Sequence, residues 1–153
     1  MYVVLFGLAL AVMIGVWFGL TTGERACRAW LEGGEPRLES ITLEIDTFWR
    51  DAKVTCDDEE ALRYLEHCFA EGCSYRGRAA LLSPNSGDDL CEVRMRFENG
   101  VEYRFGGDAY IRSDGLFLHL PGQNRLDSVS FDEPMPAEWK SVLNRLLGAG
   151  MVK

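Results

Sequence analysis

The sequence predicts an α+β protein in which an N-terminal transmembrane helix precedes a small domain of strand, helix, antiparallel meander and helix. Three observations lead to this prediction: an apolar run at the start of the chain, several short stretches of alternating apolar residues, and two amphipathic segments of helical period. Because alternation means that only one face of the sheet is buried, the domain helices are expected to pack on that single face.

The apolar run covers residues 2–20, and the first 23 residues contain no Asp, Glu, Lys, Arg or His. About 20 residues of α-helix cross a bilayer core of about 30 Å, so the run has the length of one span. It lacks the polar stripe of a water-soluble helix; the remaining alternative is a helix buried in a globular fold. Residues 1–23 are therefore predicted to be a transmembrane anchor, with the lipid bilayer as the partner of residues 2–20. Trp17, Phe18 and Trp30 are expected in the aromatic belt at the interface.

This run does not have the pattern of a cleaved signal peptide. No Lys or Arg precedes it, and it is longer than the apolar core of a typical signal. The pair Ala26-Cys27 follows charged residues, unlike the cysteine of a lipoprotein signal. We therefore expect the helix to remain on the protein as a signal-anchor.

Small residues recur at every fourth position of the apolar run, at Gly7, Ala11, Gly15 and Gly19. Gly15 and Gly19 form a G-x-x-x-G pair, which allows two membrane helices to approach closely. These four residues are the candidate helix-packing face, for a membrane-protein partner or for a second copy of the chain. Glycine is also common in membrane helices generally, so an interpretation without a partner stands beside this one.

Basic residues flank the run only on its C-terminal side, where Arg25, Arg28 and Arg37 follow it. The positive-inside rule then predicts a single-pass membrane protein whose domain is cytoplasmic. In the reducing cytoplasm the cysteines would be small apolar residues, whereas in an oxidising compartment four of the five could form two disulfides. The five are Cys27, Cys56, Cys68, Cys73 and Cys91.

Residues 24–37 are expected to form a juxtamembrane linker and residues 38–153 the soluble α+β domain. Apolar and polar residues alternate over 40–48, which predicts a strand, with 52–55 as its partner or its continuation. An acidic first turn and apolar residues at helical spacing predict a helix over 57–71.

The following part of the chain is predicted to be a meander of short strands. Asn99-Gly100 is the strongest hairpin signal in the chain, and further turns are expected at 106–108 and 113–115. Pro and Gly bound a last predicted helix over 137–147. The strands expected in this meander are 79–82, 90–97, 101–105, 110–112, 116–120 and 129–131.

Candidate catalytic or metal-binding groups are few. His67 and Cys68 are adjacent on a predicted helix, so they point about 100° apart and do not form a nucleophile–base pair by spacing. The cysteines have no C-x-x-C spacing, and the acidic run 57–60 lacks the ligand positions of an EF-hand. The sequence therefore assigns no catalytic, cofactor-binding or metal-binding residue.

The clearest candidate surface is the charged face of the predicted meander, where Arg and Glu alternate with apolar residues. The simpler interpretation is a sheet face exposed to solvent. The more specific one is a docking surface for another protein, because Arg and Tyr are favoured at protein interfaces. The candidate partner-binding residues are Arg94, Arg96, Tyr103, Arg104 and Tyr110.

The formal net charge of −8 falls entirely on residues 24–153. An acidic domain argues against nucleic acid as a partner, because phosphate binding requires clustered Lys and Arg. We expect a single-pass membrane protein, without a cofactor, whose domain is a binding module or an accessory subunit of a membrane complex. The alternatives are a thiol- or metal-dependent enzyme and an extracytoplasmic inhibitor or immunity-type domain.

Overall fold

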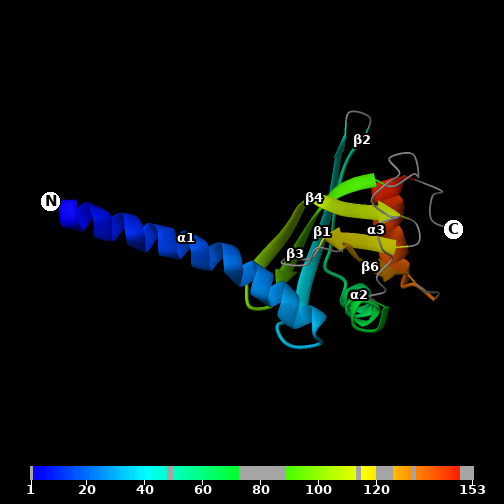
Figure 1. The fold of residues 1–153 in the computed structure, drawn as a ribbon. Coiled ribbons are helices and arrows are strands. Elements are labelled where there is room, and N and C mark those ends of the chain that lie inside the picture. The colour runs from blue at the N-terminus through cyan, green and yellow to red at the C-terminus, as the bar shows by residue number, and fades with distance from the viewer. Residues whose placement is uncertain are drawn as a thin grey trace.

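The structure of the chain, a computed structural model, consists of a long helix that projects from a domain of strands and helices (Figure 1). It describes residues 2–47, 50–72, 89–112, 115–119, 126–131 and 134–148. The elements are α1 (Tyr2–Leu31), β1 (Leu38–Thr47), β2 (Arg50–Cys56), α2 (Glu59–Gly72), β3 (Asp89–Phe97), β4 (Glu102–Arg112), β5 (Gly115–His119), β6 (Leu126–Ser130) and α3 (Ala137–Leu147). The α+β class with helices packed on an antiparallel sheet is thus confirmed. The strand predicted at 79–82 lies outside the described residues.

The strands form one antiparallel sheet of six, in the order β2-β1-β3-β4-β5-β6. All neighbours in this order follow each other in sequence except β1 and β3, which α2 separates along the chain. Figure 1 shows α2 and α3 on one side of the sheet. We call this covered side the inner face and the opposite side the outer face.

Alternation along the strands decides which residues reach the inner face. In the centre of the sheet Leu43 of β1 lies opposite Val54 of β2 and Val93 of β3, and all three are buried. Their sequence neighbours, such as Glu44 and Arg94, point to the outer face because successive strand residues alternate between faces. The predicted one-sided packing therefore follows from the period of two.

The hairpin at Asn99-Gly100 is confirmed. Gly100 has φ +79°, a conformation that L side chains rarely adopt, and the amide of Phe97 donates to the carbonyl of Val101 at 2.9 Å. The amide of Val101 donates to Oδ1 of Asn99 at 3.1 Å, so the asparagine closes the turn with its own side chain.

The turn predicted at 106–108 is wrong, because β4 continues through these residues. Cys91 pairs with Ala109 and Val93 pairs with Phe105, so three residues of β4 lie opposite Glu92 alone. This irregularity is a β-bulge, which the two glycines at 106 and 107 accommodate. The glycine pair bends one long strand and does not separate two short ones.

The helix predicted over 137–147 has these bounds, the helix predicted over 57–71 spans Glu59–Gly72, and each buries one apolar stripe. Oδ2 of Asp58 accepts a hydrogen bond from the amide of Ala61 at 2.9 Å, which caps α2. Trp139 of α3 is fully buried and its ring centroid lies 5.5 Å from that of Phe131. The residues buried by α2 and α3 are Ala61, Leu62, Leu65, Cys68, Phe69, Trp139, Val142, Leu143, Leu146 and Leu147.

The segment expected to be a juxtamembrane linker is, up to Leu31, the last part of α1. Ala26, Cys27 and Trp30 are buried in the same core cluster as the inner face of the sheet and α2. Trp30 is 5 % exposed, and its ring centroid lies 4.6 Å from that of Phe69, so its predicted place in the aromatic belt is wrong. The helix continues into the domain because these side chains lie on one face and complete the core there.

Candidate functional site

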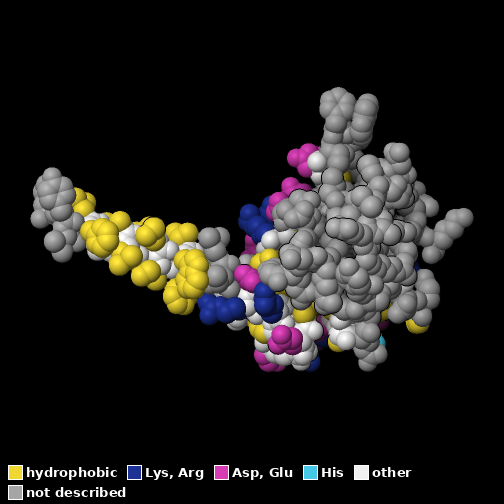
Figure 2. All heavy atoms as spheres, in the orientation of Figure 1, with side chains coloured by type: hydrophobic (Ala, Val, Ile, Leu, Met, Phe, Trp, Pro, Cys, Tyr) yellow, Lys and Arg dark blue, Asp and Glu magenta, His cyan; other side chains and the backbone are white. Residues whose placement is uncertain are grey.

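The first half of α1 carries an apolar surface that none of the described residues covers. The ten large hydrophobic side chains between Leu5 and Phe18 are each between 44 % and 72 % exposed. Figure 2 shows them as a continuous apolar rod outside the domain. By length and composition this helix is long and apolar enough to cross a membrane. An apolar patch of this extent on a protein marks a contact with lipid or with another protein.

The four small residues of the predicted packing stripe all lie on this uncovered half of α1. Gly7, Ala11, Gly15 and Gly19 are exposed, and a Cβ placed on any of the three glycines would have no neighbour within 4 Å. Residues four apart on a helix are offset by about 40°, so the stripe winds slowly around one side. The stripe therefore stays accessible to a second helix.

The second half of α1 is seated against the start of β4. A Cβ on Gly23 would lie 2.6 Å from the carbonyl oxygen of Glu102 and 3.2 Å from the ring of Tyr103. No residue other than glycine fits this position without a shift of the backbone. We call the contact of Gly23 with Glu102 and Tyr103 the α1–β4 junction.

Tyr103, one of the candidate partner-binding residues, belongs to this junction and faces the inner side of the sheet. Its ring centroid lies 4.7 Å from that of Phe105, and burial raises the pKa of its hydroxyl to about 12. The alternation of β4 places Arg104 on the outer face. The structure therefore separates Tyr103 from the candidate arginines.

The three arginines Arg94, Arg96 and Arg104 lie together on the outer face of β3 and β4. Arg94 is directly opposite Arg104, and Arg96 is opposite Glu102. Figure 2 shows Lys, Arg, Asp and Glu side chains on the side of the domain turned toward the free end of α1. We call the set Glu39, Glu44, Lys53, Glu92, Arg94, Arg96, Glu102 and Arg104 the outer charged face.

Each cation of the outer charged face has a carboxylate partner. Lys53 Nζ lies 3.0 Å and Arg94 Nη2 3.3 Å from the same oxygen of Glu44, and the hydrogen bond from Lys53 lowers the pKa of Glu44. Arg96 pairs with Glu39 at 3.0 Å and Arg104 with Glu102 at 2.8 Å. The four cations and four anions cancel, so the face has charges but no net charge.

The exposures of the arginines differ across this face. The side chains of Arg96 and Arg104 are 58 % and 60 % exposed, whereas that of Arg94 is 27 % exposed. Arg94 also pairs with Glu92, so it is held from two sides. Tyr110 lies in β4 opposite Leu90 and Phe117, and its side chain is outside the described part of the structure.

The described cysteines are buried, and none of these four is in a disulfide. They are Cys27, Cys56, Cys68 and Cys91. Burial raises the pKa of Cys56, and a thiol that stays protonated is a poor nucleophile. Within the described residues no three His, Cys, Asp or Glu side chains are grouped to hold a metal ion, and Cys73 lies outside those residues.

The sequence contained a signal for the α1–β4 junction that the prediction did not use. Gly23, Ala26, Cys27 and Trp30 are spaced i, i+3, i+4 and i+7, the spacing of one helix face. The apolar run before them has no such period. A change from uniform apolarity to an apolar stripe within one helix indicates where the segment that packs against the domain begins.

No protein-family model, curated protein or solved structure matches this chain. Its function is therefore argued from the geometry alone.

Proposed function

We propose that this protein is a single-pass, membrane-anchored binding module. The first half of α1 crosses the bilayer, and the domain presents the outer charged face to a membrane-protein partner. One observation carries the proposal: an uncovered apolar rod continues, without a break in the helix, into a buried segment of the domain core. An uncovered surface of this kind in water costs about 25 cal/mol for each Å² of apolar area.

The continuity of α1 limits how the domain can move against the bilayer. Gly23 and Trp30 fix the helix to β4 and α2, so the anchor is not joined to the domain by a flexible tether. The outer charged face then keeps one orientation relative to the membrane. A fixed orientation favours recognition of a partner that is itself in the membrane, because less rotational freedom is lost on binding.

The flanking charges favour a cytoplasmic domain. Arg25 and Arg28 are exposed, and Arg28 pairs with Glu24 at 3.0 Å just beyond the apolar run. An impermeant thiol reagent tests this side, with Glu98→Cys in the exposed hairpin turn as the labelled position. In intact cells we expect the Glu98→Cys chain to be labelled no more than the parent chain, and its labelling to increase only after lysis. Extra labelling of the variant before lysis would place the domain outside.

Extraction of membranes with alkaline carbonate tests the anchor. The full chain is expected to stay with the lipid. A chain with Val12→Lys and Val16→Lys is expected to be released, because each charge at mid-span costs about 2.5–3.5 kcal/mol. Glu98→Lys adds positive charge to the domain and serves as the matched control. Release of the unaltered chain would contradict the proposal.

Photo-crosslinking tests the partner surface. A crosslinker at Thr55, an exposed position of β2 beside the outer charged face, is expected to give an adduct of one defined mass in native membranes. The same group at Ala137, exposed on α3, is the control and is expected to give none. Arg104→Gln should reduce the adduct several-fold. Equal adducts at both positions would argue against this face.

A further inference from the structure

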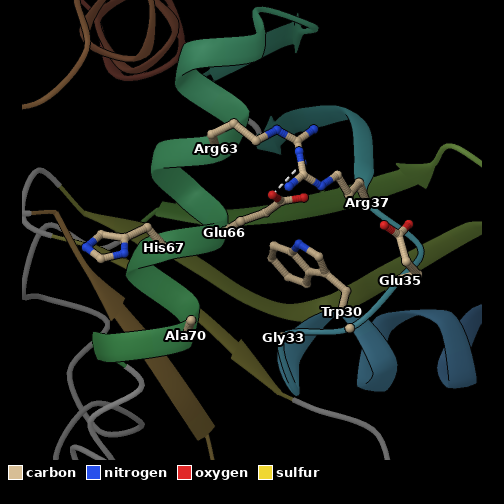
Figure 3. A pocket seen from close by; sticks show the side chains of 9 residues that line it. Trp30, Gly33, Glu35, Arg37, Arg63, Glu66, His67 and Ala70 are labelled. Atoms are coloured by element: carbon tan, nitrogen blue, oxygen red, sulfur yellow. Dashed lines mark hydrogen bonds and ion pairs between the residues drawn. The ribbon is translucent and has the colours of Figure 1, made fainter.

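A cleft outside the outer charged face lies between α2 and the end of α1. It has a volume of about 550 Å³, within the range of sites for small molecules. Trp30 and the backbone of Gly33 and Gly34 form one wall, with Glu35 and Arg37 at the loop that follows. Figure 3 shows Arg63, Glu66, His67 and Ala70 of α2 on the opposite side.

Two buried hydrogen-bond donors at this cleft have no acceptor. Nε1 of Trp30 belongs to a side chain that is 5 % exposed, and neither it nor Nε of Arg63 has a hydrogen-bond partner. Figure 3 shows the nitrogen edge of the Trp30 ring turned into the cleft, below Glu66 and Arg37. A buried donor without a partner costs about 1–3 kcal/mol, so the Trp30 nitrogen that faces the cleft indicates an acceptor that binds there.

The acceptors that line the cleft are already engaged. Oε1 of Glu66 accepts from the amide of Leu38 at 2.8 Å, and Oε2 accepts from Arg63. Nη2 of Arg63 donates to the carbonyl of Leu38 at 2.8 Å. Arg63 and Glu66 thus hold both backbone groups of the first residue of β1, which fixes the guanidinium of Arg63 beside the cleft.

Arg37 supplies a charge that no carboxylate among the described residues neutralises by an ion pair. Its guanidinium is exposed and extends from the loop toward Arg63 and Glu66 (Figure 3). Glu35 and Glu66 are the carboxylates at this cleft, against the guanidiniums of Arg37 and Arg63. A ligand with one negative charge therefore suits the cleft better than a dianion, which would meet two carboxylates.

We propose that this cleft binds a small organic monocarboxylate. Its oxygens accept from Nε1 of Trp30 and the guanidinium of Arg37, and its apolar body lies beside Ala70. The site does not depend on the membrane anchor, because its walls belong to the domain and to the buried end of α1. Arg37 sets the affinity, since charge-assisted hydrogen bonds are about twice as strong as neutral ones.

The test titrates benzoate into the full chain in detergent micelles and follows the indole N–H resonances of the tryptophans. Trp30→Phe identifies the Trp30 resonance. That resonance is expected to shift in a saturable way while those of Trp17 and Trp139 stay unchanged. Benzamide, the neutral isostere, should give no saturable shift, and inorganic phosphate should bind more weakly than benzoate.

Two arginine variants complete the test. Arg37→Gln should weaken benzoate binding about tenfold or more, with partial recovery in Arg37→Lys. Arg28→Gln, which removes an exposed charge elsewhere on α1, should bind as the parent chain does. The proposal is overturned if the Trp30 resonance does not move, if benzamide binds as well as benzoate, or if Arg37→Gln has no effect. Tighter binding of phosphate would show that the ligand class is wrong.

Discussion

The two halves of α1 differ in environment although they form one helix. In the first half Trp17 is 63 % exposed, whereas in the second half Trp30 is 5 % exposed. Glycines make the same contrast: Gly19 has open space around it, and Gly23, one turn later, touches the backbone of Glu102. The apolar character of a residue thus does not determine its surroundings. The period of the apolar pattern does, because only a striped segment can both contact a core and leave a polar side in water.

The largest effect is expected when substitutions of the two tryptophans of α1, Trp30 and Trp17, are compared. Trp30→Ala removes a buried ring that packs on Phe69 and Phe97, and should lower the free energy of unfolding of the domain by about 3–5 kcal/mol. Trp17→Ala should leave it unchanged. Urea unfolding in mild detergent, followed by the reactivity of the buried thiols, measures both. Equal losses in the two variants would abolish the contrast between the halves.

Gly19 and Gly23 give a second comparison of the two halves of α1, at the α1–β4 junction. Gly23→Ala places a methyl group against the carbonyl of Glu102 and should cost about 1–3 kcal/mol by overpacking. Gly19→Ala adds the same group in open space, where it should cost nothing in the same unfolding measurement. A stable Gly23→Ala domain would mean that α1 is not seated on β4.

The small-residue stripe tests the first half of α1 by measuring association between chains. If helices pack there, Gly15→Leu should weaken their association by about 1 kcal/mol, because the backbones no longer approach closely. Energy transfer between labelled chains in vesicles should then fall several-fold. Val16→Leu, one position along, is the matched control and should leave the transfer unchanged. Identical transfer in all three chains would favour a stripe that meets only lipid.

The smallest effect concerns the outer charged face and its pH dependence. The pKa of Glu44 is lowered in the folded chain, first by the hydrogen bond from Lys53, so its contribution is present at neutral pH. It is lost as the pH falls below about 4.3. The difference in urea midpoint between the parent chain and Glu44→Gln should therefore shrink on acidification. A difference that is the same at pH 7 and at pH 3 would contradict this contribution of Glu44.

The elements that could be predicted from the sequence are those determined by a few neighbouring residues. Asn99-Gly100 forms its hairpin, and the stripes of α2 and α3 are buried, since turn chemistry and period act within a few residues. At 106–108 the sequence predicts a turn where the structure has a bulge, because a glycine pair fits both and only the pairing with β3 distinguishes them. The burial of Trp30 depends on Phe69 and Phe97, which no local pattern connects to it.

The candidate sites follow the same division. Alternation is sufficient to place Arg94, Arg96 and Arg104 on one face of the sheet and Tyr103 on the other. The cleft beside Trp30 could not be predicted, because Arg63 and Arg37 come together only when α2 packs against the end of α1. The pattern of a sequence indicates on which face of its own helix or strand a residue lies. Which residues of different elements come into contact is known only from the fold.

Quenching of tryptophan fluorescence by lipids brominated on their acyl chains tests the central claim most directly. Chains that keep only Trp17 or only Trp30, with the other tryptophans changed to Phe, are compared in the same vesicles. Trp17 is expected to be strongly quenched and Trp30 to be unaffected, because the proposed anchor places the first half of α1 in lipid, whereas the second half is buried in the domain. Equal quenching of both, or none at Trp17, would contradict the account.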